Sequence, residues 1–394
     1  MSQPLKVMLI AIEASADALG AGLAHALRAR LGEAGVRFVG VGGARMAAEG
    51  IASPFSIDDL SLVGVIEIVT SIPLALARID AIVRLGEAER PDVAVLVDAS
   101  VFNWWVAEGL RRRAPGVAIV KYAAPQVWAT RPWRARSLAR QADHLMTLFA
   151  FEPPYFEAAG LASTFVGSPT LSADHADANP DRLRAEIGAA PDDPILLVLP
   201  GSRPSEVKRL MPTFEEVAMR LKDARPRLHL VVPAAETVTG LVKARVSGWR
   251  HAAHVVEGEK SRRDAMRAAT VALAKSGTVT TELAMAGCPM VVGYKANPIT
   301  ALIARALIQV KYLTLINIAA GEAAAPEFIQ GDCTASKLGA ALAALLDDPA
   351  RRRAQVAAQT AALAKLGAGA PDPFGAAADT VIRVLAERGR AASN

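Results

Sequence analysis

Short apolar runs alternate with helical patterns along nearly the whole chain, and this alternation restricts the fold more than any other feature. In the first half the runs predict strands at Lys6–Ile10, Arg37–Val41, Val93–Val97, Ala118–Tyr122, His144–Leu148 and Ser163–Val166. In the second half they predict strands at Ile195–Leu199, His229–Val232, Ala253–Val256, Val271–Ala274 and Met290–Gly293. Strands that alternate with helices form parallel sheets through right-handed crossovers. The sequence therefore predicts an α/β protein with two doubly wound, Rossmann-like domains that face a cleft.

Length and one polar stretch predict where the chain divides. A chain of 394 residues is longer than one hydrophobic core usually fills, so two domains are expected. Residues 172–181 are polar and rich in Asp, and they predict a linker between a first domain at 1–171 and a second at 182–350. The Ala-rich residues 351–394 predict carboxyl-terminal helices that pack on the first domain or on a partner.

Composition and charge narrow the class of protein. Apolar residues make up 52% of the chain, as buried parallel strands require, yet no apolar run is long enough to cross a bilayer. The amino terminus enters a strand without the layout of a signal peptide, so a cytoplasmic protein is expected. The net charge of +5 suits an anionic ligand or an anionic membrane surface, and it is too small and scattered to favour nucleic acid. Cys288 and Cys333 form no motif and are expected to be reduced thiols.

Two strand-to-helix turns in the second half predict a nucleotide diphosphate site. The strand Ile195–Leu199 breaks at Pro200-Gly201, so free backbone N–H groups and the forked cation of Arg203 would face the strand's carboxyl end. A similar turn follows Val271–Ala274, and one helical turn later a carboxylate could accept two hydrogen bonds from a ribose diol. Each turn alone is common in α/β proteins, but two in this order favour a binding site. The residues assigned to it are Gly201, Ser202, Arg203, Ser276, Gly277, Thr278 and Glu282.

Candidate catalytic and acceptor residues in the first half follow predicted strands. Asp98 comes directly after Val93–Val97, where a carboxylate could take a proton from an attacking hydroxyl; capping of the next helix is the alternative. Asn103 follows in the same segment. Trp128 and Arg131 lie in an aromatic and basic segment that could contact a substrate or form a surface cation–π cluster. Ligand contact and helix capping are equally open for three residues after the first strand: Glu13, Ser15 and Asp17.

Taken together and in order, these motifs resemble the lipid-A-disaccharide synthase family over nearly the whole chain. The resemblance rests on Glu13-Ala14-Ser15, Phe38–Gly43 with Arg45-Met46 and Glu49-Gly50, Asp98 with Phe102-Asn103, Pro125 with Val127–Ala129 and Arg131, Pro200–Arg203 with Glu206, Ser276–Thr278 with Glu282, Pro289–Val292 with Tyr294, and Asn317. It implies the two-domain glycosyltransferase B fold. In that fold the second domain holds most of the nucleotide sugar and the first domain holds the acceptor.

The resemblance also implies a reaction. The 6-hydroxyl of 2,3-diacylglucosamine 1-phosphate would attack the anomeric carbon of UDP-2,3-diacylglucosamine, inverting it to a β-1,6 link and releasing UDP. Asp98 would be the base, and the donor-side contacts would be Arg203, Glu282 and Asn317. No Asp-x-Asp pair follows a predicted strand, so helix amino termini and Arg203 would balance the diphosphate charge. Neither a metal nor an organic cofactor is expected.

Acylated substrates imply a peripheral protein at the inner membrane, which directs attention to residues 60–82. This segment is unusually apolar and is interrupted by Pro73. As two short helices it could cover an acyl groove or lie in the bilayer interface, with Arg78 and Arg84 at anionic head groups. An ordinary buried core helix is the alternative. The carboxyl-terminal helices leave a homodimer open.

Four positions depart from the family pattern. Ile12 and Ala16 stand where the family has glycines, Thr130 where it has a second tryptophan, and Ser168 where it has a histidine. All four lie on the acceptor side or at the hinge, so a working synthase is not the sole interpretation. The alternatives are a transferase that uses a UDP-sugar with another acceptor, a non-catalytic UDP-sugar or lipid-binding relative, and a UDP-sugar epimerase. The epimerase is least favoured, because we do not find the further acid and base groups that its chemistry needs.

Overall fold

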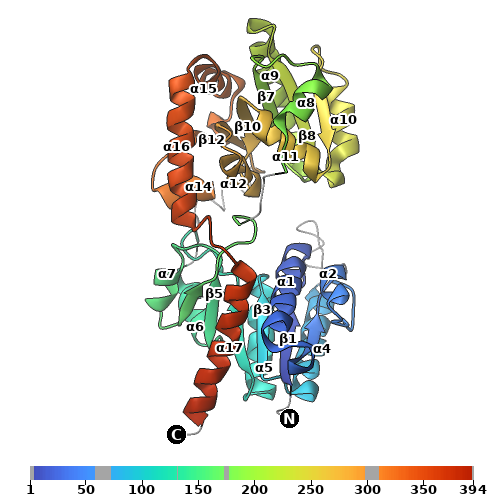
Figure 1. The fold of residues 1–394 in the computed structure, drawn as a ribbon, viewed down its shortest axis with the longest axis vertical. Coiled ribbons are helices and arrows are strands. Elements are labelled where there is room, and N and C mark those ends of the chain that lie inside the picture. The colour runs from blue at the N-terminus through green and yellow to red at the C-terminus, as the bar shows by residue number, and fades with distance from the viewer. Residues whose placement is uncertain (1–3, 58–71, 131, 173–176, 298–309, 393–394) are drawn as a thin grey trace. The chain divides into compact units, whose positions relative to one another are not determined.

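The computed structural model describes residues 4–57, 72–130, 132–172, 177–297 and 310–392. The chain divides into two compact units, Met1–Ser172 with Ala370–Asn394 and Ala173–Gly369, called here the first and the second unit. The Ala-rich carboxyl-terminal region is divided between them. Helix α16 (Pro349–Leu366) belongs to the second unit, and helix α17 (Pro373–Ala392) belongs to the first (Figure 1).

The first unit is built on one parallel sheet. Its strands are β1 (Leu5–Ile10), β2 (Val36–Val41), β3 (Val93–Val97), β4 (Ala118–Tyr122), β5 (His144–Thr147) and β6 (Ser163–Phe165), in the spatial order β2-β1-β3-β4-β5-β6. Besides α17, its helices are α1 (Ala14–Leu31), α2 (Ala44–Ala48), α4 (Ile72–Glu89), α5 (Ser100–Arg113), α6 (Trp133–Ala139) and α7 (Pro153–Glu157), with a short 3-10 helix η1 (Glu33–Gly35). The pairings between these strands are all parallel, as predicted.

The second unit repeats this design. Its strands are β7 (Ile195–Leu199), β8 (His229–Ala234), β9 (His254–Glu257), β10 (Val271–Lys275), β11 (Met290–Tyr294) and β12 (Glu327–Ile329), in the order β12-β11-β10-β7-β8-β9. Besides α16, its helices are α8 (Pro180–Ile187), α9 (Pro204–Ala224), α10 (Thr239–Val246), α11 (Glu259–Ala268), α12 (Thr278–Met285), α14 (Leu315–Ala320) and α15 (Ala335–Asp347), with 3-10 helices η3 (Glu236–Val238) and η4 (Gln330–Asp332). The doubly wound architecture is therefore confirmed, and β12 is the strand that the sequence did not predict.

In both sheets, predicted site loops lie where the order in which the chain adds strands reverses. In the first sheet the chain builds outward from β1 to β2 and then returns to add β3 on the other side. In the second sheet the same reversal separates β7 from β10. Open α/β sheets bind ligands beyond the carboxyl ends of the strands that flank such a reversal. The loops after β1, β3, β7 and β10, with the starts of the helices that follow them, carry the predicted site residues other than Trp128, Arg131 and Asn317.

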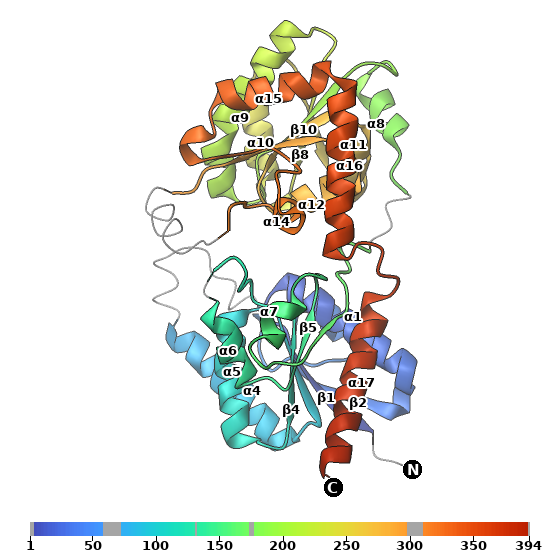
Figure 2. The same ribbon diagram turned by 90° about the vertical axis from the view of Figure 1, so that its left-hand side faces the viewer.

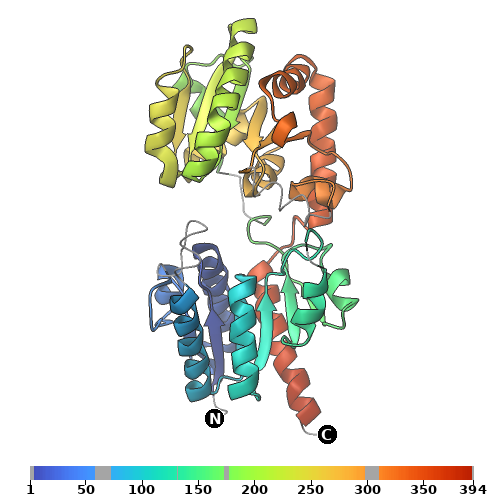
Figure 3. The ribbon, with the colours of Figure 1, turned by 180° about the vertical axis from the view of Figure 1, so that it is seen from behind.

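Alternate side chains of the central strands enter different cores, because successive residues of a strand point to opposite faces. In β1, Val7 and Leu9 pack with α1 and α17, whereas Met8 and Ile10 pack with α4 and α5. Figures 1 and 3 show these two pairs of helices on opposite faces of the first sheet. In β7 of the second unit, Leu196 and Val198 pack with α9 and α15, which lie side by side (Figure 2).

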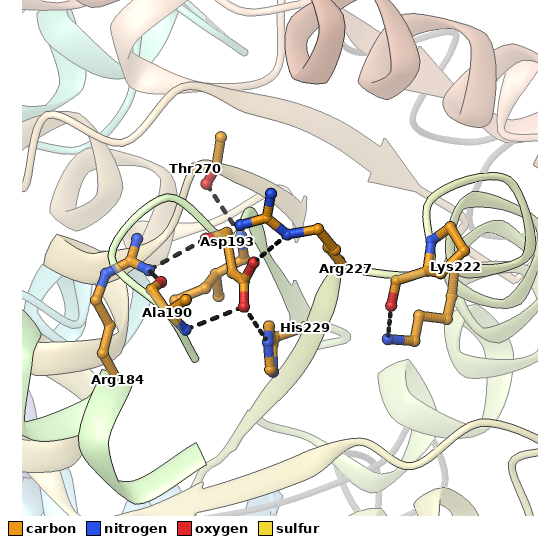
Figure 4. A network of polar contacts seen from close by, with 9 residues as sticks. Arg184, Ala190, Asp193, Lys222, Arg227, His229 and Thr270 are labelled. Atoms are coloured by element: carbon orange, nitrogen blue, oxygen red, sulfur yellow. Dashed lines mark hydrogen bonds and ion pairs between the residues drawn. The ribbon is translucent and has the colours of Figure 1, made fainter. Parts of the chain in front are cut away.

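A polar network lies at the amino-terminal ends of the strands β7 and β8 in the second sheet (Figure 4). The Asp193 carboxylate, just before β7, accepts hydrogen bonds from the Ala190 N–H at 3.0 Å and from Arg227 Nε at 2.6 Å, and it lies 3.2 Å from His229 Nε2. The Ala190 N–H, and then Arg227 and His229, lower the pKa of Asp193 to about 2 against the opposing effect of burial. Arg184 Nη1 adds bonds to the main-chain oxygens of Ala190 at 2.9 Å and Asp193 at 3.1 Å.

Candidate functional site

A glycine and a carboxylate shape the loop after β7. Gly201 has a φ of 122°, and a Cβ there would lie 2.5 Å from Glu206 Oε2, so the close approach of loop and side chain requires glycine. Glu206 Oε2 accepts hydrogen bonds from the N–H groups of Ser202 at 3.2 Å and Arg203 at 3.4 Å. These two N–H groups are therefore engaged within the protein, which corrects the expectation that the turn leaves them free for a phosphate.

Two cations lie beside the Glu206 carboxylate. Lys275 Nζ, at the end of β10, is 3.0 Å from Glu206 Oε1, and the two side chains are only 18% and 13% exposed. Arg203 Nη1 lies 3.9 Å from the same oxygen, but its side chain is 76% exposed. Because β7 and β10 are neighbours in the sheet, Glu206 links the two predicted loops. Sequence reasoning misses Lys275, although a cation at the end of an apolar strand and directly before Ser276 was a usable signal.

The loop after β10 leads into α12 and presents one carboxylate. Gly277 and Thr278 are exposed, and Ser276 is half-buried. Glu282 Oε2 accepts a hydrogen bond from Arg262 Nη1 at 2.6 Å, and the Glu282 side chain is 16% exposed. Among the residues that the structure describes, no hydrogen bond reaches the other oxygen, Oε1. Arg262 therefore orients the carboxylate and leaves one oxygen to accept from a ligand.

Asn317 is fully buried in α14. Its Nδ2 donates to the Ala325 main-chain oxygen at 2.8 Å and to Glu327 Oε1 at 2.7 Å, and its Oδ1 accepts from the Ala325 N–H at 2.8 Å. The Glu327 carboxylate also accepts from the N–H groups of Leu313 and Thr314. Asn317 thus fixes the chain between α14 and β12, and its predicted contact with the donor stays a prediction.

Asp98 lies in a left-handed turn between β3 and α5. The φ angles are 48° at Asp98 and 41° at Ala99, a conformation that costs each non-glycine residue on the order of 1–3 kcal/mol. The main-chain oxygen of Asp98 accepts hydrogen bonds from Asn103 Nδ2 at 2.8 Å and Lys121 Nζ at 2.5 Å. Within the described ranges its carboxylate makes no hydrogen bond to the N–H groups of α5. The turn is therefore held by buried side chains, and the alternative of a helix cap is not supported.

Sequence reasoning misses Lys121, which stands among the apolar residues of β4. The side chain is 2% exposed, and Nζ donates to the main-chain oxygens of Leu96, Asp98 and Tyr122. Burial lowers the pKa of Lys121 to about 7; the charge of Asp98 opposes this change and Arg134 adds to it. The usable signal was the residue type itself, because lysine is almost never fully buried without partners.

Asp17 caps another helix instead of facing solvent. It is 4% exposed, and its Oδ1 accepts from the N–H groups of Gly43 at 2.7 Å and Met46 at 3.1 Å. Its Oδ2 accepts from the Arg45 N–H at 2.9 Å. These N–H groups begin α2, which would otherwise leave them unsatisfied. Both oxygens of Asp17 are thus occupied by the protein. The predicted capping of the helix after the first strand is wrong, because α1 begins at Ala14 and contains Asp17, which caps α2 instead.

The rest of the loop after β1 divides between surface and core. Glu13 and Ser15 are exposed at the start of α1. Ile12 and Ala16 are 7% and 0% exposed and belong to the two cores of the first sheet. Apolar side chains therefore fill the positions at which the family pattern predicts glycines.

The aromatic and basic segment after β4 is partly buried. Trp128 is 9% exposed, its Nε1 donates to Glu152 Oε1 at 3.4 Å, and its ring meets Phe151 edge-on at 5.4 Å. Burial raises the pKa of Glu152 to about 7, against the hydrogen bonds from the Phe149 N–H and Trp128. Trp128 is thus a packing residue in this structure. Arg131 lies outside the described residues, Thr130 is half-buried, and Ser168 is 6% exposed.

The described part of the apolar segment is the start of α4; residues 60–71 lie outside the described ranges. Three large apolar side chains in the first turns are 51%, 37% and 53% exposed, namely Ile72, Leu74 and Leu76. Arg78 lies over the Phe55 ring at 4.5 Å, and Arg84 pairs with Asp80 at 2.7 Å.

In the part of the chain that the structure covers, no helix is long and apolar enough to cross a membrane, and no cluster of His, Cys, Asp and Glu could hold a metal ion.

The two sites suit different chemistry. A carboxylate on a fixed turn at the end of β3 suits proton transfer, because the main chain that carries it is held before a substrate binds. Two cations beside the exposed loops of the second unit suit a polyanion such as a diphosphate.

Comparison with known proteins identifies the family. A family model described as lipid-A-disaccharide synthetase matches residues 7–372. The lipid-A-disaccharide synthase of Rhodospirillum centenum is 41% identical over 386 residues, which cover 98% of this chain and 96% of that protein. The enzyme of the same name from Rhodopseudomonas palustris is 43% identical over 386 residues, which cover 96% of each chain.

Solved structures agree on the fold. The calicheamicin glycosyltransferase CalG4 matches with a TM-score of 0.61 at 17% identity, over 98% of this chain and 99% of that chain. The UDP-GlcNAc 2-epimerase of Neisseria meningitidis, bound to UDP-GlcNAc, matches with a TM-score of 0.57 at 11% identity, over 97% and 100%. At such low sequence identity, these structural matches show only a shared fold, that of two Rossmann-like domains. The match to the family model and to full-length relatives shows more, and the chain belongs to the lipid-A-disaccharide synthase family.

Proposed function

We propose that this protein is an inverting glycosyltransferase that joins two acylated glucosamine units. It transfers 2,3-diacylglucosamine from UDP to the 6-hydroxyl of 2,3-diacylglucosamine 1-phosphate, forming a β-1,6-linked disaccharide and UDP. The observation that carries the proposal is the clamped turn that presents Asp98 at the carboxyl end of β3, in a chain of this family.

Asp98 acts as the general base in this proposal. As the acceptor oxygen forms its bond to the anomeric carbon, its proton passes to the Asp98 carboxylate. The bond between the anomeric carbon and the diphosphate oxygen breaks on the opposite face, so the configuration inverts. Asn103 and Lys121 act as positioning residues, because they hold the main chain of the turn and touch no reacting atom.

The loops of the second unit bind the UDP part of the donor. Arg203 is exposed and can turn its guanidinium toward the diphosphate, and Lys275 adds a second cation at the end of the neighbouring strand. Oε1 of Glu282 accepts from a ribose hydroxyl, while Arg262 keeps the carboxylate in place. The UDP-GlcNAc bound in the epimerase of the same fold supports a UDP-sugar as the ligand.

The acylated substrates place the protein at the cytoplasmic face of the inner membrane. The first turns of α4 expose apolar side chains that suit the bilayer interface: Ile72, Leu74 and Leu76. The net charge of +5 favours anionic head groups. The protein would associate peripherally with this membrane.

UDP release tests the proposal. Purified protein is incubated with UDP-2,3-diacylglucosamine, with and without 2,3-diacylglucosamine 1-phosphate, and the products are identified by mass. Acceptor-dependent release together with the disaccharide is the expected result. Conversion of the donor sugar without an acceptor would favour an epimerase, and release that depends on a different acceptor would favour the divergent transferase. Binding of UDP without any turnover would favour a non-catalytic relative.

A further inference from the structure

An apolar pocket of about 320 Å³ lies in the first unit and is lined by residues of α5 and α6, outside the residues given a role in binding UDP. Its floor comes from the sheet and includes Leu96 and Ile119, and its walls include Ala107 of α5 and Ala142 after α6. These four side chains are at most 6% exposed. A pocket of this size is in the range that holds a small ligand or part of a larger one.

Large apolar side chains form the mouth of the pocket. Val101, Trp105 and Trp133 line it and are 64%, 48% and 64% exposed. Soluble proteins seldom leave such side chains together at the surface without a partner or a ligand. Their exposure next to a buried apolar interior indicates that a long apolar group can enter from solvent or from a membrane surface.

Most polar groups of the lining have partners within the protein, whereas two buried acceptors, Asn103 Oδ1 and Gln141 Oε1, have none among the described residues. Ser137 Oγ accepts from Trp104 Nε1 at 2.8 Å, and Gln141 Nε2 donates to Glu108 Oε2 at 3.1 Å. Lys121 Nζ makes its three bonds to main-chain oxygens. The pocket therefore offers mainly hydrocarbon surface, which suits a chain of methylene groups better than a sugar or a nucleotide.

Lys121 joins this pocket to the proposed base. Its side chain lines the pocket, and its Nζ holds the main-chain oxygen of Asp98 at 2.5 Å. Ser100, the first residue of α5, also lines the pocket, two residues after Asp98. A ligand that fills the pocket therefore reaches the turn from which Asp98 acts.

We propose that this pocket binds one acyl chain of the acceptor and so places the acceptor hydroxyl beside Asp98. The inference rests on the proposed function for the identity of the acceptor. The first turns of α4 remain available for the bilayer, because none of their residues lines the pocket.

Binding of simple alkyl phosphates tests the pocket without any turnover. Wild-type protein should bind dodecyl phosphate, below its micelle threshold, at least about tenfold more tightly than butyl phosphate. Ala107→Leu fills the interior, and Val101→Glu places a charge at the mouth in the first turn of α5, where an acidic residue is tolerated. Each variant should weaken dodecyl phosphate binding about tenfold or more, and UDP affinity should not change.

Tyr155→Glu is the matched control. Tyr155 is 48% exposed on α7 and does not line the pocket. Unchanged dodecyl phosphate binding in both pocket variants would overturn the inference. Equal weakening by Val101→Glu and Tyr155→Glu would also overturn it, because the effect would then be general repulsion of the anion.

An activity measurement separates this inference from the proposed function. If wild-type protein transfers sugar to a long-chain acceptor, the KM for that acceptor should be about tenfold higher or more in both pocket variants. The KM for a butanoyl acceptor should be the same as in wild type. If it transfers to neither acceptor, the proposed function fails, and the alkyl phosphate measurement still decides whether the pocket binds a chain. Equal KM values for both acceptors in wild-type protein would contradict the pocket inference alone.

Discussion

The two sheets place their candidate residues at corresponding positions but hold them differently. In the first unit the turn of Asp98 is strained and is fixed by the buried side chains of Asn103 and Lys121. In the second unit Arg203 is 76% exposed at the end of a loop whose N–H groups bind Glu206. A base must meet one proton at a set geometry, whereas a cation attracts a diphosphate over a wider range of positions. Under the proposed function, this contrast fits a first unit that carries the base and a second unit that binds UDP.

Asp98→Asn gives the largest effect expected from this contrast. The amide keeps the shape of the side chain but cannot take a proton, so turnover should fall about 100-fold or more while UDP affinity stays the same. Steady-state UDP release and calorimetry measure the two quantities. Asp80→Asn, which changes an exposed carboxylate of α4, is the control. Unchanged turnover of Asp98→Asn would show that Asp98 is not the general base.

Arg203→Ala should lower the affinity for UDP, which is the quantity that Asp98→Asn leaves unchanged. Loss of a charge-assisted bond to the diphosphate should weaken UDP binding by roughly 1.5–3 kcal/mol, which is about 10- to 150-fold in Kd. Calorimetric titration with UDP measures it, with Arg220→Ala on the exposed face of α9 as the control. A loss no larger than in the control would show that Arg203 is a surface residue only.

Lys121→Met should change how stability depends on pH. Burial lowers the pKa of Lys121 from 10.5 to about 7, so between these values the unfolded chain holds more protons than the folded one. The free energy of unfolding should therefore rise with pH across this window in wild-type protein. In Lys121→Met this rise should be smaller, as measured by urea unfolding at several pH values. A curve parallel to wild type, as expected for the exposed Lys337→Met, would contradict burial of the Lys121 ammonium.

Asp193→Asn should have the smallest effect, because its network lies at the amino-terminal edge of the second sheet. The pKa of Asp193 is lowered from 3.8 to about 2, so its stabilisation is present above pH 4 or so and is lost as the pH falls toward 2. As the pH falls through this range, the free energy of unfolding of the variant should decrease less steeply than that of wild type. UDP affinity and turnover should remain those of wild type. The neighbouring exposed Asp192→Asn is the control, and a change in UDP affinity would show that this edge is coupled to the binding loops.

The fold could be predicted from the sequence because each central strand is a continuous apolar run. Ile195–Leu199 and Val93–Val97 begin and end in the structure where the sequence predicts them. β12 was missed because Glu327–Ile329 has only three residues and no apolar run. The loops could be located for the same reason, since the predicted site residues other than Asn317 were found relative to the end of a strand; Asn317 came from the family resemblance alone.

Side-chain environments could not be predicted in this way. Whether a polar side chain is free depends on partners outside its own helix or loop, such as Gly43 for Asp17 and Ala325 for Asn317. A lysine within a buried apolar strand marks Lys121 as unusual, but its acceptors are main-chain oxygens, which the residue pattern does not identify. Sequence therefore located the two sites, while the division between contacting and supporting residues required the structure.

The return of α17 to the first unit has a consequence for synthesis. Ala377, Ala378 and Val381 are fully buried against the first sheet, although they follow the whole second unit in the sequence. While a ribosome makes the chain, the part of the first core that α17 covers stays exposed beside α1 until residues 373–392 emerge. The second unit is complete before that moment. The amino-terminal unit of this protein is thus the last part to be completed.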